Sequence, residues 1–300
     1  MDNSIKIFGL IIILFLNGCA QDKDVLIKSI KTVTGTAIEQ VDEIIQDEIK
    51  RDFDDGAIDN QNSIVNFDKE GRVLRKMFFQ SDLEVNFTQN YEYNNLGDVT
   101  LVSNFQDGNL VGKEYYKYDE YNRLFGVKTI EADGSVSNFT MVTYEDNNNT
   151  VITKYYKSDD FYSQGILQQT QIEKFDSNKN LIYRRVEFGE DMEVYQDRFK
   201  TYQYDSLNQL ILIESYQKDM PESFINNGGR EASYSKYQEE EFEYDEFGNV
   251  VKDFMFHDIA MLSKNYKYVY QYNDFGDWIK CVRYQNEIPM FITLRDISYY

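Results

Sequence analysis

The sequence is poor in the residues that build covalent or metal-based frameworks. Among its 300 residues there are two cysteines, one histidine, one tryptophan and two prolines. Two cysteines cannot make a disulfide framework or a cysteine-cluster metal site, and one histidine excludes a histidine-rich zinc site. So few prolines, with 16 glycines, do not fit a collagen-like or disordered chain. We therefore expect no metal and no cofactor.

Basic residues are scarce relative to acidic ones. The chain has 31 Lys and Arg against 52 Asp and Glu, a formal net charge of −21 at pH 7. Such a surface repels phosphate groups, so we expect no nucleic acid partner and no attraction to anionic lipid headgroups. Solubility explains this acidity more simply than selection for cationic partners does.

The first 24 residues have the pattern of a secretory signal followed by a lipid attachment site. An apolar run from Ile7 to Leu16 follows Lys6, too short to cross a bilayer as a helix but suited to a signal peptide. Leu16-Asn17-Gly18-Cys19 resembles the bacterial lipobox. We expect residues 1–18 to be removed, Cys19 to carry the lipid, and residues 19–24 to form the tether. The alternative is an ordinary signal peptide that happens to contain a cysteine.

One short pattern recurs eight times after the signal. Each copy begins with Tyr or Phe, continues with an acidic residue or Asn and two variable residues, and usually ends on Gly or Asn. The leading aromatics, spaced 25 to 40 residues apart, are Phe67, Tyr93, Tyr118, Tyr144, Phe175, Tyr204, Tyr244 and Tyr272. The closing residues are Gly71, Gly97, Asn122, Asn148, Asn208, Gly248 and Gly276, with Lys179 as the one poor fit. Regular self-similarity of this length indicates a repeat architecture.

The pattern has the chemistry of a hairpin turn. Asp or Asn at the second position can accept hydrogen bonds from backbone amides two residues on. Gly or Asn three positions later can take the left-handed conformation that closes a hairpin with a bulge. Before the turns aromatics alternate, most extensively from Tyr266 to Tyr272, and this spacing places them on one face of a strand. Each copy therefore predicts a strand, a turn and a second strand.

Eight copies predict about sixteen strands, with further strands at the ends. Flat sheets of that width are rare because strands twist. We therefore expect one all-β domain over residues 25–300: a curled antiparallel sheet or spiral of tandem hairpins, shaped as a trough, a spiral or an open barrel, with the aromatic face inside and acidic and polar residues outside. Within residues 25–53, Ile27–Thr34 favours a strand. Glu39–Lys50 contains good helix formers, so a short helix there is the alternative.

The copies resemble YD (Rhs-type) repeats, and the chain from about residue 25 onward resembles the YD-repeat lipoproteins of Bacteroidota. Residues 276–300 strengthen this resemblance, with Gly276-Asp277-Trp278-Ile279-Lys280 followed by a closing strand that ends on Tyr299-Tyr300. The resemblance implies that this segment forms a terminal cap containing Trp278, Arg295 and Tyr299. Large Rhs toxins use such repeats as a shell around a toxin. This chain is far shorter, so we do not expect that role.

No motif for catalysis stands out. Nothing near His257 resembles a nucleophile elbow, so we expect a packed or solvent-facing histidine. Local turn hydrogen bonds explain the Asp-rich turns better than calcium does, because the turns lack the alternating ligands of a calcium loop. Trp278 is interpreted as a cap over the core, with a stacking platform for a sugar as the alternative. Cys281 is expected to be a small packed residue.

Together these features predict a non-catalytic, lipid-anchored binding or interaction module of the cell envelope. Its expected partners are the membrane, through the N-terminal lipid, and an unidentified glycan or envelope protein. Carbohydrate binding is the sharper version, because tyrosine offers a flat face and a hydroxyl group. The expected location is the outer membrane, on its periplasmic or its cell-surface face. The alternative function is an envelope hydrolase that uses a pair of carboxylates.

Overall fold

The computed structural model describes residues 25–36, 62–79, 85–145, 149–159, 162–188, 198–218, 234–257 and 264–300. In these ranges the chain forms eighteen β-strands and no helix. No helix of the described ranges is long and apolar enough to cross a membrane. The strands are β1 (Ile27–Thr36), β2 (Ser63–Phe67), β3 (Val73–Phe79), β4 (Val85–Tyr93), β5 (Val99–Gln106), β6 (Asn109–Tyr118), β7 (Leu124–Glu131), β8 (Val136–Glu145), β9 (Thr150–Asp159), β10 (Tyr162–Phe175), β11 (Leu181–Phe188), β12 (Arg198–Tyr204), β13 (Leu210–Lys218), β14 (Tyr234–Tyr244), β15 (Val250–His257), β16 (Lys264–Tyr272), β17 (Trp278–Gln285) and β18 (Ile288–Tyr299).

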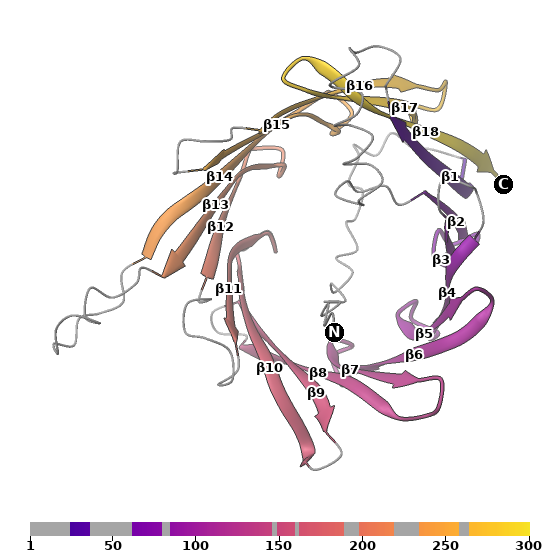
Figure 1. The fold of residues 1–300 in the computed structure, drawn as a ribbon, viewed down its shortest axis with the longest axis vertical. Helices are drawn as coiled ribbons and strands as arrows, with labels where there is room; N and C mark the ends of the chain where they lie inside the picture. Colours follow the sequence, from indigo (N-terminus) through magenta and orange to yellow (C-terminus); the bar gives the residue numbers. More distant parts are fainter. Residues whose placement is uncertain are drawn as a thin grey trace, which may run out of the picture.

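The strands close into a ring. Each pairs antiparallel with its neighbours along the chain, and the first strand also pairs with the last. β1 contacts β2 on one side and β18 on the other, and its register with β18 runs from Ile27 opposite Tyr299 to Thr36 opposite Phe291. Figure 1 shows β1 and β18 side by side in a complete ring of strands. The fold is therefore a closed barrel without a free strand edge.

The predicted all-β antiparallel class is confirmed, whereas the predicted form of the sheet is not. The all-β antiparallel class is as expected, and β1 confirms the strand predicted over Ile27–Thr34. The open curled sheet or spiral is wrong, because β1 and β18 pair with each other instead of ending the sheet. Unpaired edges expose backbone N–H and C=O groups, and closure removes both edges. Residues 276–300, predicted as an end cap, contain β17 and β18, and β18 forms one side of this seam. Residues 37–53 lie outside the described residues.

The repeat turns share one set of hydrogen bonds. In the turn of Asp205, the carboxylate oxygen Oδ1 accepts from the backbone N–H groups of Leu207 at 2.9 Å and Gln209 at 2.8 Å. Asn208 closes the turn with a φ of 67°. The same pair of bonds is accepted by Asp68, Asn94, Asp119, Asp176, Asp245 and Asn273. The turns are thus fixed locally, as their chemistry predicted.

Positive φ angles mark the closing position of each turn. They occur at Gly71, Gly97, Asn122, Asn149, Lys179, Asn208, Gly248 and Gly276. Lys179 takes a φ of 68° although its side chain fits this conformation poorly. In the fourth copy Asn149 has the positive φ, whereas the predicted Asn148 lies outside the described residues.

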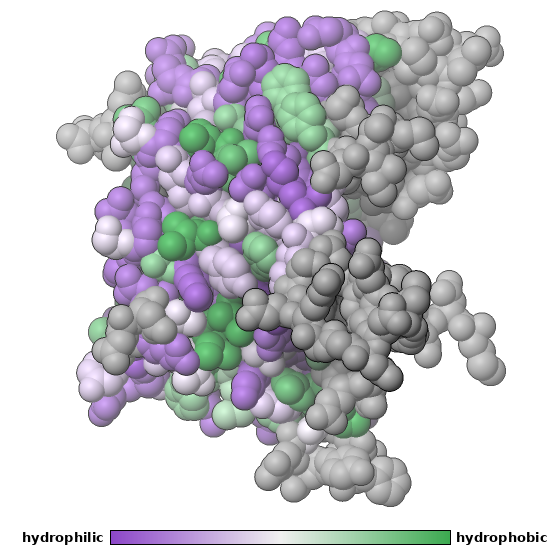
Figure 2. Space-filling view, turned by 90° about the vertical axis from the view of Figure 1, so that its left-hand side faces the viewer, coloured by the Kyte–Doolittle hydropathy of each residue, from purple (hydrophilic) through white to green (hydrophobic). Residues whose placement is uncertain are grey.

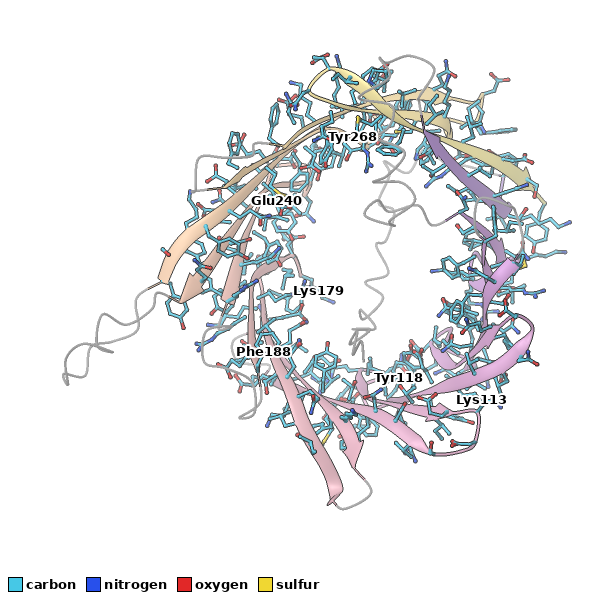
Figure 3. All side chains as sticks on the ribbon, viewed as in Figure 1. Lys113, Tyr118, Lys179, Phe188, Glu240 and Tyr268 are labelled. Carbon is cyan, nitrogen blue, oxygen red and sulfur yellow. The ribbon has the colours of Figure 1, made fainter. Side chains whose placement is uncertain are left out.

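The two faces of the barrel wall carry different side chains. Figure 3 shows Tyr118, Glu240 and Tyr268 pointing into the ring and Lys113 pointing away from it. Directly opposed residues of an antiparallel pair lie on the same face, so the strand register extends this assignment around the barrel. We call the two faces the inner wall and the outer wall. The tyrosines that alternate before the repeat turns lie on the inner wall.

Charged residues are spread over the outer wall. Lys128 pairs with Phe139, Lys154 with Met141 and Lys267 with Tyr284, all on the face of Lys113. Figure 2 shows one side of this wall as a mixture of hydrophilic and hydrophobic residues without a continuous hydrophobic band. A lipid-facing strand surface needs such a band, and one Lys or Arg at mid-membrane costs about 2–4 kcal/mol. Charged and hydrophobic side chains are therefore mixed on this side of the outer wall.

The repeat tyrosines fasten each hairpin to the one before it. The hydroxyl group of Tyr118, at the end of β6, donates to the backbone carbonyl of Val99 at 2.8 Å, at the start of β5. The same bond recurs from Tyr93 to Val73, Tyr144 to Leu124, Tyr204 to Leu181, Tyr244 to Leu210 and Tyr270 to Val250. Tyr300, which follows β18, instead donates to the backbone carbonyl of Phe67 at the end of β2. These bonds use the hydroxyl groups for structure.

Few side chains are fully buried in this wall. Among the described residues the buried hydrophobic ones are Phe79, Val102, Cys281 and Phe291. The half-buried inner-wall tyrosines, together with the strand ladders, therefore take over the role that a conventional core has in other folds.

We predict that Tyr118→Phe destabilises the barrel, because it removes the donor to the Val99 carbonyl while keeping the ring. The expected loss is about 1 kcal/mol in the free energy of unfolding, measured by urea denaturation. Tyr121→Phe is the matched control, because Tyr121 is 72% exposed at a turn tip. Equal stability losses in both variants would show that the bond is not structural.

Candidate binding site on the inner wall

Part of the inner wall is a closed hydrogen-bond network. Gln89 donates to Asn104 at 3.1 Å, Asn104 donates to Glu114 at 3.0 Å, and the hydroxyl group of Tyr116 donates to Glu114 at 2.8 Å. Asn104 and Gln89 are buried, with exposures of 7% and 9%. These polar groups satisfy one another across β4, β5 and β6, so this region stabilises the wall and leaves little to bind a ligand.

A second inner-wall cluster is an ion pair. Arg184 on β11 binds Glu173 on β10, with 2.7 Å between the guanidinium Nη2 and the carboxylate Oε1. Arg184 also lies over the ring of Tyr202, 6.0 Å from its centroid. This guanidinium already has its carboxylate, so the cluster is internally compensated.

The third cluster differs because its arginines face aromatic rings. Arg283 on β17 lies 4.5 Å from the ring centroid of Phe291 and 5.4 Å from that of Tyr266. Arg295 on β18 lies 3.4 Å from the ring centroid of Trp278. Among the described residues, the Nε atoms of both arginines are buried without a hydrogen-bond partner. We call Arg283, Arg295 and the rings they contact the arginine–aromatic cluster.

Cys281 lies between the two arginines on the inner wall. It pairs with Tyr270 on β16 and with Thr293 on β18. Burial raises the pKa of its thiol to about 11, although the hydrogen bond from Tyr270 and the charges of Arg283 and Arg295 oppose this rise. Cys281 is thus a packed thiol whose electrostatic environment includes both arginines.

Burial also acts on Arg295 itself. It lowers the pKa of Arg295 to about 10, against the opposing influence of Tyr270, Cys281 and Asp277. The carboxylate of Asp277 accepts a hydrogen bond from the Tyr299 hydroxyl group at 2.8 Å. Removing a guanidinium from water costs several kcal/mol, whereas a desolvated cation–π contact returns about 2 kcal/mol. An anion at this cluster would therefore meet cations that the fold compensates only in part.

The structure separates the predicted site residues into several places. Trp278 is covered by Arg295 on one side and lies 5.7 Å from the Tyr270 ring, so its face is not a free platform for a sugar. Tyr299 bonds Asn273 and Asp277 beside the last repeat turn. His257 is the last residue of β15, and Cys19 lies outside the described residues. The residue that the sequence did not single out is Arg283. Its only sequence signal is that it lies two residues after Cys281 and so on the same face.

Comparison with known proteins identifies no family. No family model matches the sequence, and no curated protein matches it. A Photorhabdus luminescens Tc holotoxin pore matches with 13% identity over 74% of this chain and a TM-score of 0.30. A porin-like protein from Bacteroides uniformis matches with 10% identity, 91% of this chain, 96% of that chain and a TM-score of 0.37. A porin-like protein from Bacteroides vulgatus matches with 10% identity, 92% of this chain, 99% of that chain and a TM-score of 0.31.

These likenesses are weak. This chain spans 14% to 16% of the length of the Tc toxin chains that it matches. All the TM-scores are 0.37 or lower, so the matched structures give no evidence about the function of this chain.

The inner-wall tyrosines predict a loss of stability in alkali. Burial raises the pKa of Tyr268 to about 12, and burial is also the main cause that raises the pKa of Tyr91, Tyr116 and Tyr270. Tyrosines of the unfolded chain ionise near pH 10. The folded state therefore holds more protons above that pH, and stability falls as pH rises beyond it.

This pH dependence is measured by urea denaturation at pH 8 and pH 10.5, followed by tyrosinate absorbance. The expected result is a lower urea midpoint at pH 10.5, with tyrosinate appearing as the barrel unfolds. The Tyr116→Phe variant removes one titrating group and should lose less stability between the two pH values. A midpoint that does not change with pH contradicts the assignment.

Proposed function

We propose that this chain is a non-catalytic, lipid-anchored module of the cell envelope, built of YD-type repeats, that binds an acidic glycan on its inner wall. The observation that carries the proposal is the arginine–aromatic cluster, where two partly compensated guanidinium groups share one wall with aromatic rings. Guanidinium groups bind carboxylates through paired, charge-assisted hydrogen bonds.

The spacing of the two arginines suggests a ligand longer than one sugar. Arg283 pairs with Phe291, and Arg295 lies four residues further along β18. At about 3.3 Å per residue the two backbone positions are roughly 13 Å apart along the strand. This spacing suits an oligosaccharide that carries a carboxylate on successive sugars.

The repeat tyrosines are a less suitable ligand site, because their hydroxyl groups already form hydrogen bonds within the fold. Tyr118, Tyr204 and Tyr244 each donate their hydroxyl group to a backbone carbonyl. A sugar bound along these tyrosines would have to compete with these hydrogen bonds. The arginine–aromatic cluster has donors that the fold leaves without partners, so it is the better ligand site on the described wall.

The outer wall favours anchoring by a lipid over insertion of the barrel. Its lysines at positions such as Lys113 and Lys128 are unsuited to a lipid environment. A lipid on Cys19 would hold the barrel at the membrane while its wall remains in water. We therefore propose an outer-membrane lipoprotein whose barrel stands outside the bilayer, on the periplasmic or the cell-surface face.

A hydrolase that uses two carboxylates is the less favoured function. Glu114 accepts hydrogen bonds from Asn104 and Tyr116, and Glu173 is paired with Arg184. Carboxylates held in this way are tied to structural partners, whereas a hydrolytic pair must reach the two sides of a glycosidic bond. A binding role needs no such pair.

The test is to measure binding of an oligouronate and of a neutral oligosaccharide of equal length by calorimetry. We expect the oligouronate to bind, and Arg283→Gln and Arg295→Gln each to weaken binding about tenfold, as loss of one charge-assisted bond predicts. Arg185→Gln is the matched control, because Arg185 lies on the outer wall and pairs with Glu187.

Three outcomes would contradict this proposal. One is equal binding of the neutral sugar, and another is undiminished binding by both inner-wall variants. The third is that no glycan binds while one protein is recovered in stoichiometric amount in an envelope pull-down. That result would assign the module to protein interaction instead.

A further inference from the structure

One rim of the barrel carries large apolar side chains at its turn tips. We call the seven described repeat turns, residues 68–72, 94–98, 119–123, 176–180, 205–209, 245–249 and 273–277, the turn rim. All of them connect an even-numbered strand to the next odd-numbered one, so they lie at the same end of the barrel. The residue before the closing Gly or Asn is exposed in five of them: Leu96 by 75%, Tyr121 by 72%, Leu207 by 76%, Phe247 by 37% and Phe275 by 47%.

The turn fixes the backbone at each of these tips. The backbone N–H group of the tip residue donates to the side-chain oxygen of the Asp or Asn two residues earlier, as Leu96 does to Asn94 and Leu207 to Asp205, both at 2.9 Å. The rings of Phe247 and Phe275 lie 4.4 Å and 4.7 Å from those of Tyr272 and Tyr299, so these two tips are partly packed. Leu96 and Leu207 are the most exposed of the tips.

The opposite rim is different wherever the structure describes it. Its described turn tips are Asp107-Gly108, Ala132-Asp133-Gly134 and Asn286-Glu287. These tips are small or polar and present no large apolar side chain. Among the described turns, the large apolar tips therefore belong to the turn rim.

The chain enters the barrel at the turn rim. β1 begins there, since Ile27 pairs with Tyr299 and the backbone N–H group of Tyr300 donates to the carbonyl of Leu26 at 3.0 Å. Leu26 and Tyr300 are themselves 47% and 50% exposed. Six residues, 19–24, precede Val25 from Cys19 onward, and six residues span at most about 20 Å. A lipid on Cys19 would therefore hold this rim, and not the opposite one, close to the membrane.

We propose that the turn rim is a second membrane contact, in which the apolar turn tips enter the headgroup layer of the bilayer to which Cys19 is anchored. This inference rests on the lipid anchor of the proposed function. Leucine and aromatic side chains partition into the interface between headgroups and acyl chains. In this orientation the turn rim faces the membrane and the opposite rim faces away from it.

The charge of the rim selects the kind of bilayer. The seven turns contain eleven Asp and Glu against four Lys and Arg. Like charges repel, so this rim is suited to zwitterionic headgroups and unsuited to anionic ones. The occupant of the rim is thus a zwitterionic membrane surface.

The experiment uses tryptophan fluorescence, because Trp278 is the only tryptophan. The full chain is produced with its signal and lipid, and is reconstituted into zwitterionic vesicles that contain lipids brominated near the headgroup. Leu207→Trp on the turn rim and Leu110→Trp near the opposite rim are compared in a Trp278→Phe background. If that background does not fold, Trp278 is kept and the emission of the parent is subtracted.

We expect the emission of L207W to be quenched and that of L110W to be unchanged, with weaker quenching of L207W when anionic lipid replaces zwitterionic lipid. Flotation of the vesicles, with Cys19→Ala as the control, reports anchoring separately. If the chain floats but L207W is not quenched, or both positions are quenched equally, the rim contact is overturned while the anchor stands. If the chain with Cys19 does not float, the anchor of the proposed function fails and the rim contact fails with it.

Discussion

Pairing between β1 and β18 is the interaction on which the rest of the barrel depends. Without it, an eighteen-strand sheet would expose the backbone groups of two edges, and the few buried hydrophobic residues offer little to compensate. The pairing runs along the whole of β1, from Ile27 to Thr36. Closure also gives the sheet an inside, and only an inside allows the tyrosines and arginines of successive repeats to share one wall.

The seam and the candidate site belong to the same part of the molecule. Arg295 lies on β18, the strand that pairs with β1, and Arg283 lies on the strand next to it. Elsewhere on the described inner wall, polar groups such as Glu114 and Glu173 are bonded within the repeats. The last repeat differs because β18 also pairs with β1. Its inner-wall residues include arginines that face aromatic rings, in place of a network of polar groups bonded to one another.

Local features of this fold could be predicted from the sequence, and long-range ones could not. The Asp or Asn of each turn acts through amides two and four residues on, so turns and strand number follow from short patterns such as Tyr204 to Gln209. Closure depends on Ile27–Thr36 finding Phe291–Tyr299 at the other end of the chain, and no local signal encodes this. Arg283 is one of 31 basic residues in the sequence, and only the strand register shows that it faces Tyr266 and Phe291.

The most direct test of the account is amide hydrogen exchange at the seam between β1 and β18. A closed barrel predicts that the hydrogen-bonded amides of β1 and β18 exchange as slowly as those between β5 and β6 in the middle of the array. Rapid exchange along β1 and the facing side of β18, with slow exchange elsewhere, would show an open sheet and contradict the closed ring from which both the inner-wall site and the turn rim are argued.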